Sequence, residues 1–287
     1  MSCEPSFNFT IDGHRMTIIE VDGNEVEPVE VDSIFILPGQ RYSVVVTANK
    51  SIGNYWVRSL NDQLITTFDG GQGMAILRYE GAPDEDPTSD AGPYELSFDE
   101  GKLHPLVNPG APGIPEIGKA DVNLVLAPGF TVEGHFTFGN TTWQNPTVPV
   151  LLQILSGAKQ ASQLLPNGSV YALPPNKVIE ISFPTTDIAP GSPVSATLLK
   201  HHSILTLCSF FVAPCTSAWC MYTTLCRFCL RLNFFQNAFD VVRIAGSNTT
   251  NFVNPVRRDV VSLGSSSTDN VTIRFVTDNA GPWFLHW

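Results

Sequence analysis

Charge of either sign is scarce in this chain, because only 15% of its 287 residues are charged. Basic residues are scarcer than acidic ones, 16 against 27, which gives a net charge of −11 at pH 7. A nucleic-acid partner requires a basic face for its phosphates, so this composition argues against one. The acidic balance fits a soluble protein that works in mildly acidic surroundings.

The chain also lacks any long segment with the 3.6-residue spacing of an amphipathic helix. Glycine and proline are abundant, at 22 each, as is typical of loop-rich β proteins. Strand signals recur at Arg41–Val46, Val150–Leu155, Val178–Phe183 and Asn270–Phe275. In the last of these, the apolar residues alternate and are expected to face one way. The sequence therefore predicts an all-β fold of β-sandwich or Greek-key barrel domains.

No signal peptide is visible at the start of the chain, since Met1–Pro5 has neither a basic start nor an apolar run. Six Asn-x-Ser/Thr sequons are nevertheless present, at Asn8, Asn49, Asn140, Asn167, Asn248 and Asn270. Such a set favours a secreted, extracellular glycoprotein. We therefore expect that the signal peptide is missing from this chain.

Acidic residues are absent from the segment 194–236, which is crowded with Cys, Phe, Leu, Ser and Thr. Five of the six cysteines fall in it, within about twenty residues, unlike the even spread of a disulfide framework. Cys226-x-x-Cys229 near His201 and His202 matches no zinc-finger spacing. The uncharged stretch 203–226 is about long enough to span a membrane, but Pro214 interrupts it. We expect neither a zinc site nor a membrane span.

Several stretches, taken together, resemble fungal laccases, which are multicopper oxidases. They are Ser2–Pro5, Ile11–Gly23, Asn54–Arg58, Ala75–Tyr79, Leu103–Val107, Pro149–Ile154 and Gly281–His286. The resemblance covers nearly everything except the segment 194–236. It implies tandem cupredoxin-like Greek-key β-barrel domains, with this chain starting inside the second of three.

The expected domains meet near residue 100, inside a stretch from about 83 to 115 that is rich in Pro, Gly and acids. Residues 1–100 would then be an incomplete second cupredoxin domain. Residues 101–287 would be an incomplete third domain, interrupted by the segment 194–236.

The resemblance also implies a chemistry. Such enzymes remove single electrons from phenols or aromatic amines at a type 1 copper and reduce dioxygen to water at a trinuclear copper cluster. A complete enzyme holds about four copper ions, and the type 1 site needs a Cys thiolate and two imidazoles. Phenolic or aromatic amine donors and dioxygen are therefore the expected partners, with neither nucleic acid nor membrane.

The copper-ligand motifs of the family are broken in this sequence. The family's His-Pro-x-His-Leu-His-Gly motif is expected after Ala189–Pro193, but Val194 follows instead. Its His-Cys-His motif is expected at the C-terminus, where His286 is followed by Trp287. Of the motif ligands, His286 alone remains, as a match to a trinuclear-cluster ligand. We therefore expect this chain to bind no copper tightly and to be inactive.

Other residues match family positions outside the copper motifs. Glu4 matches a carboxylate that hydrogen-bonds the phenol or amine at the type 1 pocket and accepts its proton. Pro190 matches a residue that lines this pocket, although a turn proline explains it equally well. Cys3 matches a cysteine that pairs with the first domain, and here it is a disulfide candidate without that partner. His14, His104 and His135 are not at ligand positions and are expected to be structural or exposed.

The copper-ligand motifs break off at sharp positions, which suggests that the segment 194–236 contains translated introns. Codons for Val194–Ser195 and Cys220–Tyr222 can form intron donors, and codons for Val212–Ala213 and Phe234–Gln236 can form acceptors. Between these introns, Ala213–Trp219 read one base out of frame is compatible with His-Pro-Val-His-Leu-His-Gly. Trp287 and a stop can likewise be a split Cys codon that runs into an intron.

Alternatives remain open at this stage. The segment 194–236 can be a real insertion that the protein tolerates. The chain can belong to another multicopper oxidase type, a ferroxidase or an ascorbate oxidase. It can also be a non-catalytic cupredoxin-like binding or structural protein.

Overall fold

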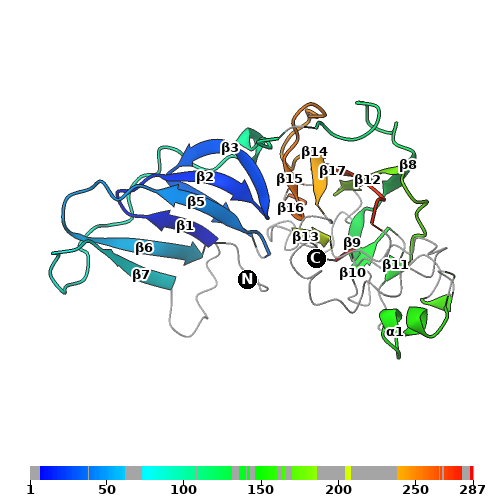
Figure 1. Cartoon of the computed structure of the whole chain (residues 1–287), viewed down its shortest axis with the longest axis horizontal. Coiled ribbons are helices and arrows are strands. Elements are labelled where there is room, and N and C mark those ends of the chain that lie inside the picture. Colours follow the sequence, from blue (N-terminus) through cyan, green and yellow to red (C-terminus); the bar gives the residue numbers. More distant parts are fainter. Residues whose placement is uncertain are drawn as a thin grey trace. The chain divides into compact units, whose positions relative to one another are not determined.

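In the computed structural model, the regular secondary structure of the described residues is almost entirely β-strand. The structure describes residues 7–37, 39–61, 73–107, 109–130, 136–139, 141–142, 146–158, 160, 163–165, 170–185, 204–207, 238–264, 266, 268–279 and 285–286. The chain divides into two compact units, Met1–Val107 and Asn108–Trp287 (Figure 1). Their assignment as second and third cupredoxin domains stays a prediction.

Unit 1 contains two antiparallel sheets. The first has the order β4-β1-β6-β7 and is built from β4 (Ser33–Ile36), β1 (Phe7–Ile11), β6 (Asn54–Asn61) and β7 (Gly73–Arg78). The second has the order β3-β2-β5 and is built from β3 (Asn24–Val31), β2 (Met16–Val21) and β5 (Tyr42–Val46). A short 3-10 helix, η1 (Glu100–Lys102), follows.

A tight turn fixes the register of the β2–β3 hairpin. Asp22 and Gly23 both have positive φ, 50° and 84°, as expected for the two-residue turn that matches the twist of its strands. Val21 therefore faces Asn24 across the ladder. The core that this hairpin helps to form includes Met16 and Ile18, which are fully buried.

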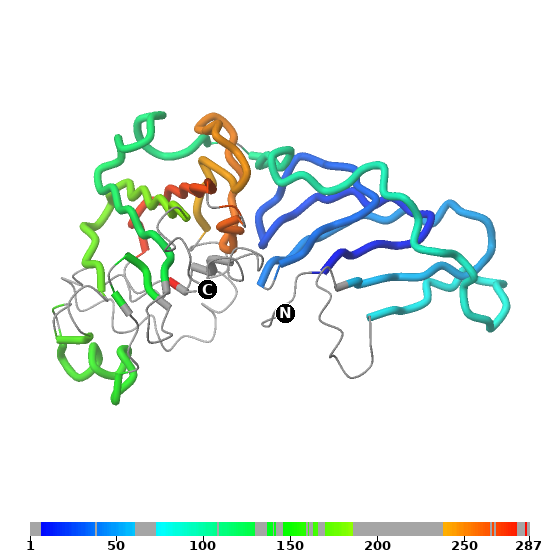
Figure 2. Tube along the Cα trace, turned by 180° about the vertical axis from the view of Figure 1, so that it is seen from behind, coloured from blue at the N-terminus to red at the C-terminus, as the bar shows by residue number. Residues whose placement is uncertain are grey.

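Unit 2 is organised around a five-stranded sheet with the order β15-β14-β17-β12-β8. Its strands are β15 (Arg257–Arg258), β14 (Phe239–Arg243), β17 (Asn270–Val276), β12 (Val178–Pro184) and β8 (Val122–Val125). Strands β12 and β17 are far apart in the sequence but pair antiparallel along their whole length (Figure 2). Strand β8 pairs parallel with β12.

Two smaller sheets complete the strands described in unit 2. One has the order β11-β10-β9, from β11 (Thr141–Thr142), β10 (Phe136–Phe138) and β9 (Pro128–Phe130). The other has the order β16-β13-β18, from β16 (Val260–Ser262), β13 (Ile204–Leu207) and β18 (Leu285–His286). Strand β13 lies within the unusual segment 194–236, so part of that segment is placed in a sheet.

The strand expected at Val150–Leu155 was wrong, because these residues form the helix α1. Val150 and Ile154 are four positions apart and therefore lie on one helical face, which packs against Leu164 and Leu165. An apolar run of this length cannot be assigned to helix or strand from periodicity alone. The other three predicted strands overlap β5, β12 and β17.

The predicted all-β class is confirmed in the part of the chain that the structure describes. Within the same residues, no helix is long and apolar enough to cross a membrane.

Candidate functional site

His286, which the resemblance suggests as a copper ligand, lies on strand β18. This strand pairs antiparallel with β13, so that His286 is opposite Thr206 and Leu285 is opposite Leu207. On its other side β13 pairs with β16. The backbone of His286 is thus held at the edge of a sheet whose central strand comes from the unusual segment.

Unit 1 contains a polar cleft of about 610 Å³ that the sequence did not point to. Its floor includes the turn after β1, where Asp12 accepts two hydrogen bonds from Arg58, at 2.9 Å from Nε and 2.8 Å from Nη2. Ser89 Oγ donates to the same carboxylate at 2.5 Å. Burial alone raises the pKa of Asp12, but the donors Arg58 and Ser89 more than offset it, so the pKa lies below its usual value.

A buried histidine supports the same turn. His14 is buried, with only 3% of its surface exposed. Its Nδ1 donates a hydrogen bond to the Asp12 carbonyl oxygen at 2.8 Å. This leaves Nε2 to accept from the Tyr79 hydroxyl at 2.6 Å. The ring also meets Tyr55 edge-on, with centroids 4.8 Å apart. These contacts occupy both ring nitrogens, so His14 has a structural role.

Sequence reasoning missed this cleft because its parts are distant in the chain. Asp12 and Arg58 are separated by 46 positions and meet through the β1–β6 ladder, in which Thr10 is opposite Arg58. A stretch rich in turn formers and acids, expected to act as a linker, contributes Ser89 and its neighbours to the wall. No local spacing in the sequence signals such a meeting.

Comparison with known proteins identifies the family. Multicopper oxidase family models match residues 1–82 and 236–286. Laccase-5 of Trametes villosa is 49% identical over 100% of this chain, and Laccase-1 of Pleurotus ostreatus is 46% identical over the same share. The chain belongs to the multicopper oxidase family.

The chain spans about half the length of the curated relatives it matches, 48% of the Trametes villosa laccase and 47% of the Pleurotus ostreatus laccase. Solved multicopper oxidases share its fold. The structure of Fet3p, described as a multicopper oxidase that functions in iron import, superposes with a TM-score of 0.70 at 20% identity, covering 98% of this chain and 50% of Fet3p. The laccase of Botrytis aclada gives a TM-score of 0.67 at 22% identity, covering 98% and 46%.

The residues that the structure describes do not include a complete set of copper donors. Among the described residues, no group of three His, Cys, Asp or Glu side chains gathers closely enough to hold a metal ion. A type 1 copper requires a thiolate, and all six cysteines lie outside the described residues. His14 is committed to other partners, as shown above. The structure therefore gives no basis for a step through copper in this chain.

Other residues singled out from the sequence fall outside the described part of the structure. These are Cys3, Glu4, Pro190, His135 and the sequons at Asn140 and Asn167. Their suggested roles stay predictions.

The four described sequons differ in their surroundings. Asn49 and Asn248 are exposed in loops. Asn8 lies within β1 and Asn270 begins β17, and both are only partly exposed. The sequon threonines of these two, Thr10 and Thr272, are buried, at 1% and 0% exposed. Asn49 and Asn248 therefore offer better geometry for a glycan than Asn8 and Asn270.

Proposed function

We propose that this chain derives from a laccase-type multicopper oxidase, an enzyme that oxidises phenols or aromatic amines and reduces dioxygen to water. The observation that carries the proposal is identity of 46–49% with several fungal laccases across the whole chain. Copper is the cofactor of the parent enzyme, and the sequons support a secreted, extracellular glycoprotein.

In this proposal, the retained residues keep their family roles. Glu4 hydrogen-bonds the phenol or amine, and Pro190 lines the pocket. His286 ligates the trinuclear cluster in the parent enzyme. Units 1 and 2 correspond to the second and third cupredoxin domains.

The chain with the printed sequence is proposed to be inactive. It contains neither His-Pro-x-His-Leu-His-Gly nor His-Cys-His, so it lacks the thiolate and most imidazoles that the copper sites need. Retained introns explain the loss at 194–236 and at Trp287. The second family-model match begins at residue 236, where the unusual segment ends, and this supports the explanation.

The first experiment is to sequence the transcript across codons 186–245 and beyond codon 287. The proposal expects the segment 194–236 to shrink to His-Pro-x-His-Leu-His-Gly, and Trp287 to become Cys-His. A transcript that matches the printed sequence would overturn the intron explanation and favour a non-catalytic cupredoxin-like protein.

The second experiment compares two purified proteins. One is the 287-residue chain, and the other is the full-length protein encoded by the spliced transcript. Each is assayed for bound copper and for oxidation of a phenol, an aromatic amine, ascorbate and ferrous iron. The laccase proposal expects copper and phenol oxidation only in the full-length protein. A preference for ferrous iron or ascorbate would replace laccase with a ferroxidase or an ascorbate oxidase.

A further inference from the structure

The cleft in unit 1 combines negative charge with buried oxygen atoms that have no hydrogen-bond partner. Its lining contains five carboxylates and two cationic side chains, namely Asp12, Glu30, Asp32, Asp90 and Glu95 with Arg15 and Lys50. Arg15 lies 3.2 Å from Glu30 and 4.0 Å from Glu95, and Asp12 is neutralised by Arg58. The remaining charge favours a cation.

Three oxygens in the cleft lining are buried and unpartnered: Thr10 Oγ1, Asp32 Oδ1 and the Tyr94 hydroxyl. Half of the six such side-chain atoms in the described residues therefore belong to this one cleft. Thr10 is the most enclosed of the three, at 1% exposed. A buried polar group without a partner is costly, so a ligand or ordered water is expected to satisfy these oxygens.

All three residues line this cleft, and backbone contacts place them in neighbouring segments. Thr10 is opposite Ser33 in the β1–β4 ladder, and Asp32 immediately precedes Ser33. The other oxygen of Asp32, Oδ2, accepts from the backbone N–H groups of Glu95 at 2.6 Å and Leu96 at 2.8 Å. These bonds hold the backbone that follows Tyr94 against Asp32, while Asp32 Oδ1 is left free of protein donors.

We propose that this cleft binds a primary ammonium group, with Asp32 Oδ1 and the hydroxyls of Thr10 and Tyr94 accepting its hydrogen bonds. An ammonium carries three N–H donors and no acceptor, which matches three unpartnered oxygens of which one is charged. A divalent metal fits less well, because Ca²⁺ takes about six to eight oxygens and usually several carboxylates. The ligand class is therefore a small aliphatic amine.

The segment 89–95 contributes Ser89, Asp90 and Gly92–Glu95 to the lining of the cleft. This segment is held at both ends, by Ser89 on Asp12 and by the Glu95 N–H on Asp32. Between those anchors, residues 90–93 are exposed. Because the three oxygens are shielded from solvent, a shift of this segment accompanies binding.

The test is calorimetric titration of the full chain with 1,4-diaminobutane at pH 7 and fixed ionic strength, with its fully methylated analogue, 1,4-bis(trimethylammonio)butane, as the matched probe. Both probes carry two positive charges at this pH, but the methylated analogue has no N–H donor. Saturable binding of the diamine and none of the methylated analogue is expected. Equal binding of both probes, or no saturation up to about 10 mM diamine, would overturn the proposal and leave water as the partner of these oxygens.

Three variants locate the site: Thr10→Val, Asp32→Asn and Tyr94→Phe. Each keeps the shape of its side chain, and each is expected to weaken diamine binding at least about tenfold, since each removes an acceptor for a charged donor. Circular dichroism shows whether each variant folds. If one of them does not, diamine binding by the other two still tests the assigned acceptors.

The matched control is Glu30→Gln, which changes the charge of the cleft by the same amount as Asp32→Asn but leaves the three oxygens in place. It is expected to change the affinity less than about threefold, as for an exposed and screened charge. An equal loss in Glu30→Gln and Asp32→Asn would show that only the overall charge matters, and would refute the assigned acceptors.

Discussion

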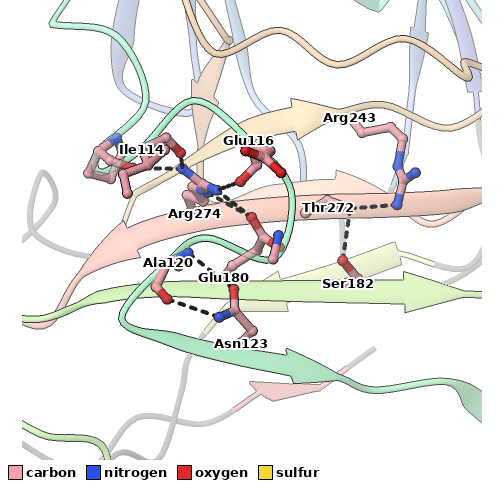
Figure 3. Close-up of polar contacts among 11 residues, drawn as sticks. Ile114, Glu116, Ala120, Asn123, Glu180, Ser182, Arg243, Thr272 and Arg274 are labelled. Carbon is pink, nitrogen blue, oxygen red and sulfur yellow. Dashed lines mark hydrogen bonds and ion pairs between the residues drawn. The ribbon is translucent and has the colours of Figure 1, made fainter.

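Arg274 lies against Glu180 across the β12–β17 ladder, with Nε and Nη2 at 2.8 Å and 2.7 Å from the same carboxylate oxygen (Figure 3). Both side chains are buried, at 0% and 3% exposed. The guanidinium also donates to the carbonyls of Pro112, Ile114 and Glu116. Arg274 therefore fastens the segment 112–116 to the central sheet of unit 2.

Replacement of this arginine is expected to be severe. Arg274→Met removes all of these bonds and leaves the Glu180 carboxylate buried without its cation, which costs about 3–5 kcal/mol. The free energy of unfolding from urea titration measures the loss. In the double variant with Glu180→Gln, part of the stability should return, because no charge is then left unpaired. A double variant as unstable as Arg274→Met would show that the carbonyl bonds, and not the ion pair, dominate.

Asp240 makes the stability of unit 2 depend on pH. Burial raises its pKa to about 6, against a smaller opposing effect of Arg257, whose nearest nitrogen is 3.9 Å away. The folded state thus holds this proton more tightly than the unfolded chain, whose pKa is near 3.8. The stabilisation of the folded state by protonated Asp240 is therefore fully present below about pH 4. It is lost as pH rises through 6, which lowers the free energy of unfolding by up to about 3 kcal/mol.

Asp240→Asn should remove this dependence, because an amide does not titrate. The variant is expected to be more stable than the parent chain above pH 6, and the gain should fade towards pH 4. Thermal unfolding midpoints between pH 4 and 7.5 test this. Parallel pH curves for the two proteins would contradict the assignment to Asp240.

Gly264 is required by its contact with Asp269. A Cβ at this position would lie 2.0 Å from Asp269 Oδ2, and the backbone φ is +88°. That carboxylate accepts from the N–H groups of Gly246 at 2.8 Å and Ser266 at 2.8 Å. Gly264→Ala is therefore expected to cost more than about 2 kcal/mol in unfolding free energy, from strain and from the displaced carboxylate.

The matched control for this substitution is Gly157→Ala. Gly157 also has positive φ, +108°, but a Cβ there meets nothing within 4 Å. Its cost should be limited to backbone strain, about 1–2 kcal/mol. Equal losses in the two variants would mean that the Asp269 contact contributes nothing measurable.

Glycan attachment should follow the exposure of the sequons. In a secreting host we expect modification at the exposed Asn49 and Asn248, and little at Asn8 and Asn270, whose sequon threonines are buried. Intact mass of the single Asn→Gln variants measures this. A mass decrease for Asn8→Gln or Asn270→Gln equal to that for Asn49→Gln would refute the dependence on exposure.

Patterns along the chain predicted part of this fold. The alternation in Asn270–Phe275 correctly indicated a strand, and the sequence similarity indicated the family. The alternation did not reveal that the polar residues of β12 and β17 are buried as well. Glu180, Ser182, Thr272 and Arg274 are buried, because the sheet is covered on both faces and these residues pair with one another.

The sequence by itself indicated the all-β class and the family, because alternating apolar residues and family motifs can be read from residue order alone. The tertiary structure decided which distant residues come together: Asp12 pairs with Arg58, Glu180 pairs with Arg274, and Thr10, Asp32 and Tyr94 line one cleft. These contacts depend on strand register, which sets the residues that lie opposite one another, and on burial, which removes water as a hydrogen-bond partner. Residue types that are common on surfaces are therefore found here as buried ion pairs or as unpartnered acceptors.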